Sequence, residues 1–142
     1  MTKPTFEKID ASDALLYGPV KLLLCGFMPP AQSKFKTLLG MLNLSHLPLV
    51  WVCTNQMTAA LEDLLRLPEG SGEGQASEMP RAIIVSGISQ QSLHLLMSAC
   101  RQAGMIKALW AVLTPISEKW PLQRLLNELA AERAALSKPK KK

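Results

Sequence analysis

Residues 22–27 (LLLCGF) and 83–88 (IIVSGI) share one pattern, a short apolar run followed by a glycine and one more apolar residue. Further along the chain, 50–54 (VWVCT) resembles 109–114 (LWAVLT), so a glycine, a tryptophan and a threonine occur twice in the same order at nearly equal spacing. Such internal similarity is the usual sign of a repeated structural unit. We therefore predict that one βαβα unit occurs twice.

Short apolar runs predict four strands, and apolar side chains three and four positions apart predict the inner faces of four helices. The expected strands are 21–27, 49–53, 82–85 and 107–113, and the expected helices are 31–44, 57–65, 89–104 and 121–136. Strands that alternate with helices indicate an α/β fold. The two units are expected to form one four-stranded, mainly parallel sheet with helices on both faces, in the strand order 2-1-3-4.

The chain divides into a single α/β domain and two flanking segments. From its start it comprises an N-terminal arm (1–20), a repeat unit (21–67), a connector (68–80), a second repeat unit (81–136) and a basic tail (137–142). The connector reads PEGSGEGQASEMP, and its glycines and glutamates are typical of a flexible linker. A lid over a binding site is the alternative role for it.

Composition indicates a folded globular protein, because 48% of the 142 residues are hydrophobic and 19% are charged. The net charge of +5 comes mostly from the tail, where Lys138, Lys140, Lys141 and Lys142 lie together. The other basic residues are scattered, without the clustering that marks a nucleic-acid-binding face. This distribution argues against nucleic acid as the partner.

Cysteines and histidines give no metal-binding pattern. Cys25, Cys53 and Cys100 lie far apart, and neither His46 nor His94 shares a zinc-ligand spacing with them. The sequence therefore predicts no metal and no cofactor. It also shows no signal peptide and no apolar run long enough to cross a bilayer, which indicates a cytoplasmic protein with free thiols and no membrane partner.

The second half carries the most specific motif, Leu109-Trp110-Ala111-Val112-Leu113-Thr114-Pro115 followed by Trp120 and Leu122, together with the run 80–85. In these residues it resembles an uncharacterised prokaryotic family, domain-of-unknown-function family 3783, over roughly residues 80–136. The first half resembles a divergent copy of the same unit. It keeps Gly26, Trp51 and Thr54, but Asn55 stands where the second half has Pro115. The resemblance implies neither a reaction nor a ligand.

The ends of the predicted strands are where a parallel α/β sheet would bind a ligand. The candidate ligand-binding residues there are Gly26, Thr54, Asn55, Ser86, Gly87 and Thr114. On one shared edge they would offer hydroxyls, an amide and free N–H groups at helix N-termini, which suit a small anion or a phosphate. The alternative is structural, with the glycines forming turns and the polar residues capping helices.

Other side chains suggest a protein partner or a thiol. Trp120, with Lys119 beside it, is a candidate partner-binding residue, because exposed tryptophans are common binding hot spots; the alternative is that Trp120 packs the last helix onto the sheet. Cys25 and Cys53 close adjacent strands, so a thiol role is a further hypothesis, although buried cysteines usually serve only as small hydrophobic groups.

No Asp, Glu or His ends any predicted strand, so that edge lacks a general base, and we predict no catalytic residue. The sequence favours a non-catalytic interaction module that binds a protein partner or a second copy of itself. The alternatives are a sensor for a small anionic ligand at the strand ends and a thiol-dependent enzyme.

Overall fold

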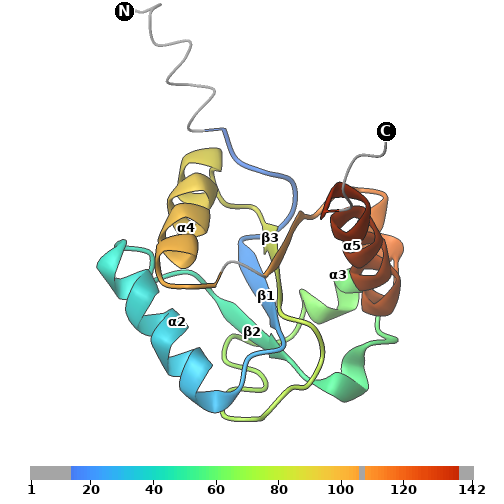
Figure 1. Ribbon diagram of the computed structural model, residues 1–142, viewed down its shortest axis with the longest axis horizontal. Helices are drawn as coiled ribbons and strands as arrows, with labels where there is room; N and C mark the ends of the chain where they lie inside the picture. The colour runs from blue at the N-terminus through green and yellow to red at the C-terminus, as the bar shows by residue number, and fades with distance from the viewer. Residues whose placement is uncertain (1–13, 106–107, 138–142) are drawn as a thin grey trace, which may run out of the picture.

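The computed structural model describes residues 14–105 and 108–137. The strands are β1 (Lys21–Cys25), β2 (Leu49–Val52), β3 (Ala82–Ser86) and β4 (Leu109–Val112). The longer helices are α2 (Pro29–Met41), α4 (Gln90–Gln102) and α5 (Leu122–Ser137), with the shorter α3 (Leu61–Leu64) and the 3₁₀ turns η1 (Thr54–Gln56) and η2 (Ser117–Lys119). The two halves therefore have the same order of elements: strand, helix, strand, 3₁₀ turn and helix (Figure 1).

The four strands form one sheet in the order β2-β1-β3-β4, which is the predicted order. The expectation of a mainly parallel sheet is wrong. β1 pairs parallel with β2, and β3 pairs parallel with β4, but the central pair is antiparallel, with Leu23 opposite Ile84. The sheet is therefore mixed, with two parallel pairs that run in opposite directions.

The connector between the halves explains this reversal. After α3 the chain lies near the start of β1, because the Lys21 ammonium donates hydrogen bonds to the carbonyl oxygens of Leu65 and Leu67. It then runs along β2, where the Gly70 amide donates to Leu49 and the Trp51 amide donates to Ser71. This path carries the chain to the far end of β1 before β3 begins, so β3 must run antiparallel to β1.

The connector forms hydrogen bonds and an ion pair with α2. The buried amide of Gln32 donates to the carbonyl oxygens of Phe27 and Gln75 and accepts a hydrogen bond from the Gly74 amide. Lys36 adds an exposed ion pair with Glu73 at 2.7 Å. These bonds anchor the middle of the connector to α2, and its flexibility stays a prediction.

Helices cover both faces of the sheet, as expected. One apolar core packs α2 and α4 onto the sheet through residues such as Leu24, Phe35 and Leu96. The opposite core packs α3 and α5 through residues such as Leu61, Ile84 and Leu122. Figure 1 shows α2 and α4 together on one side of the sheet and α3 and α5 on the other.

The reversed second half accounts for this grouping. Right-handed crossovers that step outward in opposite directions place their helices on opposite faces when all strands are parallel. Because β3 and β4 run against β1 and β2, the crossover helices α2 and α4 come to the same face.

The helix expected over 57–65 is shorter, since α3 spans only Leu61–Leu64 after the η1 turn. The backbone before α3 bonds to the start of α5 instead: the Leu122 amide donates to Ala59, and the Gln123 amide donates to Met57. Other boundaries differ from the predictions by a few residues, and Ser89 caps α4 as expected, with its hydroxyl accepting a hydrogen bond from the Ser92 amide.

Two glycines permit the halves to meet closely. Gly26 has a φ of +76°, and a Cβ placed there would lie 2.4 Å from the Met79 carbonyl oxygen. Gly87 has a φ of +73°, and its Cβ would lie 2.5 Å from the Gly18 carbonyl oxygen. Each glycine thus follows the first strand of one half and touches the segment that leads into the first strand of the other.

We expect Gly26→Ala to lower the free energy of unfolding by about 2 kcal/mol or more, because it adds steric overlap to the cost of a left-handed backbone. Gly74→Ala shares the positive φ in open space and should cost only about 1–2 kcal/mol. Gly40→Ala, within α2 and in open space, should stabilise by about 0.5–1 kcal/mol. Urea unfolding of the three variants measures these differences, and equal effects at Gly26 and Gly74 would contradict the close approach.

Candidate functional site

The antiparallel centre of the sheet separates the predicted strand-end residues into two groups. Cys25 lies opposite Ala82, and Ser86 lies opposite Lys21. The carboxyl ends of β1 and β3 therefore lie at opposite ends of the sheet. One end of the sheet has the residues that follow β1 and β2, namely Gly26, Thr54 and Asn55. The other end has Ser86, Gly87 and Thr114. The six residues therefore do not share the one end of the sheet on which the sequence analysis expected them.

At both ends of the sheet, side-chain hydroxyls of the predicted residues form hydrogen bonds within the fold. The Ser86 hydroxyl is fully buried and donates to the Tyr17 carbonyl oxygen at 3.4 Å. The Thr114 hydroxyl donates to the Ser117 hydroxyl and accepts a hydrogen bond from the Ser117 amide at 2.9 Å, which closes the turn before η2. The Thr54 hydroxyl accepts a long hydrogen bond from the Glu78 amide. Asn55 is exposed on η1.

Trp120 lies where α3 meets the start of α5. Its carbonyl oxygen accepts a hydrogen bond from the Leu61 amide, its ring packs against the core under α5, and the Arg124 guanidinium lies 4.0 Å from the ring centroid. Lys119 forms an ion pair with Glu62 at 3.3 Å. These contacts are those expected of a tryptophan that holds the last helix in place.

The three thiols differ in their environments. Burial raises the pKa of Cys25 to about 12, and it raises the pKa of Cys100 to about 11 against the lowering effect of Arg81. Both groups are therefore neutral thiols near pH 7, which argues against Cys25 as a nucleophile. Cys53 is partly exposed, with its sulfur 3.7 Å from Gln75 Oε1.

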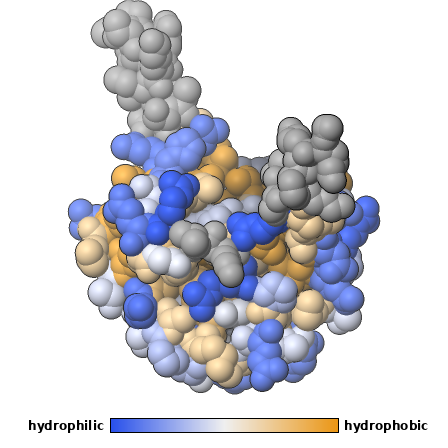
Figure 2. Space-filling view, in the orientation of Figure 1, coloured by the Kyte–Doolittle hydropathy of each residue, from blue (hydrophilic) through white to orange (hydrophobic). Residues whose placement is uncertain are grey.

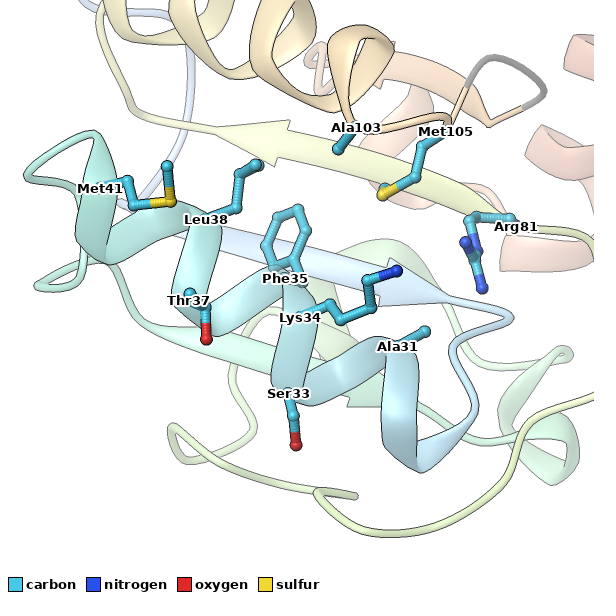
Figure 3. A pocket seen from close by; sticks show the side chains of 10 residues that line it. All are labelled: Ala31, Ser33, Lys34, Phe35, Thr37, Leu38, Met41, Arg81, Ala103 and Met105. Carbon is cyan, nitrogen blue, oxygen red and sulfur yellow. The ribbon is translucent and has the colours of Figure 1, made fainter.

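A groove lies between α2 and the end of α4, with a volume of about 380 Å³ (Figure 3). Its apolar wall consists of Ala31, Phe35, Leu38, Met41, Ala103 and Met105. Figure 2 shows apolar surface on the side of the molecule that α2 and α4 occupy in Figure 1. Met41 is 76% exposed, so apolar surface extends outward from the groove.

Two cations lie at one end of this groove. Figure 3 shows the amino group of Lys34 and the guanidinium of Arg81 on the same side, with Leu38 and Met41 toward the other end. Within 14–105 and 108–137, neither cation has an acidic partner within ion-pair distance. The groove therefore combines apolar walls with two positive charges that no described acidic residue neutralises.

Arg81 is held in place by an aromatic cluster. Its guanidinium carbon lies 4.6 Å from the centroid of the Phe27 ring, and Phe27, Phe35 and Trp51 pack edge to face with one another. Its Nε atom is buried and has no hydrogen-bond acceptor among the described residues. An unmet buried donor of this kind costs about 1–3 kcal/mol.

The comparisons with known proteins identify the second half of the chain. Residues 81–136 match a family described as Domain of unknown function (DUF3783). The resemblance seen in the sequence is thus confirmed for this half. No curated protein and no solved structure matches the chain.

The groove joins this DUF3783 region to the first half of the chain. Arg81 and Met105 belong to the DUF3783 match, whereas Lys34 and the apolar wall of α2 do not. Sequence reasoning missed the groove. A usable signal was present in α2, where Ala31, Lys34, Leu38 and Met41 follow one another at three and four positions, beside the stripe that enters the core.

The described residues contain neither a metal-binding cluster nor a membrane-spanning helix. No cluster of His, Cys, Asp and Glu there could hold a metal ion. Over the same residues, no helix has the length and apolar character to span a membrane.

We expect only Cys53 to react with a thiol reagent such as dithionitrobenzoate in the native protein at pH 8. Cys25 and Cys100 are buried and un-ionised, so the thiol count should be one in buffer and three in denaturant. Cys53→Ser should abolish native labelling. Native labelling of more than one thiol would contradict the burial of the other two.

Proposed function

We propose that this protein is a non-catalytic binding module that holds a small amphiphilic anion, such as an alkyl carboxylate or alkyl phosphate, in the groove between α2 and α4. The observation that carries this proposal is the pairing of Lys34 and Arg81 at one end of an apolar groove, without an acidic partner among the described residues. The small anion was the alternative to a protein partner in the sequence analysis, and the proposal moves its site from the strand ends to the helices.

Charge is the first support. The anionic group of a ligand in the groove could accept a hydrogen bond from the Arg81 guanidinium, and Lys34 would supply a second charge-assisted bond. The stacking of Arg81 on Phe27 restricts the guanidinium before binding, which reduces the entropy lost when a ligand binds.

Size and polarity are the second support. A volume of about 380 Å³ falls within the range of roughly 300–1,000 Å³ typical of small-molecule sites. Leu38, Met41 and Met105 would contact an alkyl chain, and the flexible methionines can adapt to its shape. These dimensions favour a small ligand in the groove over a folded protein partner.

The chemistry of the lining residues supports binding without catalysis. They provide an amine, a guanidinium and two hydroxyls, but no carboxylate, imidazole or thiol that could serve as a general base. Cys100, whose pKa Arg81 influences, is buried and neutral near pH 7.

The finer expectations from the sequence remain proposals. The shared order of elements and the reciprocal contacts of Gly26 and Gly87 support descent of the two halves from one repeated unit. A cytoplasmic location, a partner at Trp120 and Lys119, and ligand contacts at the six strand-end residues stay predictions.

We expect decanoate to bind the wild-type protein more tightly than decanol, whose chain is equally long but uncharged. Arg81→Gln and Lys34→Gln should each weaken decanoate binding by roughly tenfold or more, because each removes a charge-assisted hydrogen bond worth about 1.5–3 kcal/mol. Isothermal titration calorimetry of both ligands measures the affinities.

Lys36→Gln is the matched control, because Lys36 lies on the same helix but pairs with Glu73 and does not line the groove. It should leave decanoate binding unchanged. Equal affinities for decanoate and decanol, or equal losses from Lys36→Gln and Arg81→Gln, would refute the proposed role of the groove.

A further inference from the structure

The two outer strands of the sheet, β2 and β4, differ in what covers their outer edges. At the β2 edge the connector covers the strand, with the Gly70 amide donating to Leu49 and the Trp51 amide donating to Ser71, both at 2.8 Å, and every β2 residue is buried. At the β4 edge, Trp110, Ala111 and Val112 remain partly exposed. Among the described strands, β4 pairs with β3 alone.

The pairing of β4 with β3 determines which backbone N–H and C=O groups of β4 point away from the sheet. The Leu109 amide donates to Arg81 and the Leu113 amide donates to Val85, so alternate residues, including Ala111, direct their backbone groups toward β3. The N–H and C=O groups of Trp110 and Val112 therefore point to the open edge, where the described residues supply no hydrogen-bond partner.

The edge lacks several of the features that prevent strands from pairing, although β4 is only four residues long. β4 reads LWAV, without a charged residue, a proline or a bulge. One carbonyl is already occupied, because Arg133 from α5 donates to the Ala108 oxygen at 3.0 Å just before the strand. The open part of the edge is thus limited to the two outward residues, Trp110 and Val112.

These two residues complement each other in an antiparallel pair of identical strands. We propose that β4 pairs with β4 of a second copy, with Ala111 on the twofold axis, so that the two sheets join into one of eight strands. Trp110 of each copy then lies opposite Val112 of the other, and each such pair exchanges both of its outward backbone hydrogen bonds.

The side chains fit the same register. Trp110 and Val112 share one face of β4 and pack against the core under α2 and α4 while remaining partly exposed. In the dimer each tryptophan ring would lie beside a valine across the strands, a pairing that contributes roughly 0.2–1 kcal/mol. Symmetry gives this contact twice, which favours a second copy of this chain over an unrelated strand. The inference is independent of the groove.

Sedimentation equilibrium of the full chain over a range of concentrations tests this inference. We expect a reversible dimer whose dissociation constant rises roughly tenfold or more in Val112→Lys, because the lysine places like charges at a paired edge. Val20→Lys is the matched control at an exposed valine beside β1, and it should leave the dimer intact. A monomer at all concentrations, or equal effects of the two lysines, overturns the proposal.

A cysteine at the twofold axis tests the register without adding charge to the strand. In a Cys53→Ser background, Ala111→Cys places two thiols at a non-hydrogen-bonded pair with Cα atoms about 4.5 Å apart, close enough for a disulfide. Oxidation should give a covalent dimer that a reductant reverses, whereas Val20→Cys in the same background should stay monomeric on denaturing gels. Failure of Ala111→Cys to cross-link, or equal cross-linking by both variants, overturns the proposed register.

Discussion

The antiparallel pairing of β1 with β3 is the constraint on which the other features of the molecule depend. Five residue pairs join these strands at the centre of the sheet, and Gly26 and Gly87 permit close backbone contact at its two ends. The reversed direction of the second half places α2 and α4 on the same face of the sheet. It also places the carboxyl ends of the two pairs of strands at opposite ends of the sheet. The same reversal therefore forms the groove between α2 and α4 and separates the predicted strand-end residues.

Much of the fold was predictable from local sequence because local forces decide it. The apolar runs around Leu23 and Ile84 formed strands, Ser89 capped a helix, and the strand order followed from the simplest arrangement of two units. Strand direction was not predictable in this way. It depends on the path of residues 68–80. Their Gly-rich composition suggested a flexible linker, but Gln32, a polar residue buried in α2, bonds to the backbone of Gly74 and Gln75.

The site was less predictable than the fold because its parts come from segments far apart in the chain. Lys34 lies within the predicted helix 31–44, and Arg81 directly precedes the predicted strand 82–85, so neither residue marks a site in the sequence. Only the packing of α2 beside the end of α4 brings them to one groove. The strand-end residues, by contrast, had a recognisable pattern, but capping and turn formation account for the contacts of Ser86 and Thr114.

The connector has two effects that together leave β4 as the exposed edge. By running along β2 it reverses the direction of the second half and also covers one side of the sheet with hydrogen bonds. The second half has no equivalent segment beside β4 among the described residues, although it repeats the order of the first. The two halves therefore differ at their outer strands, and the proposed pairing with a second copy would cover the edge of β4 that the connector leaves open.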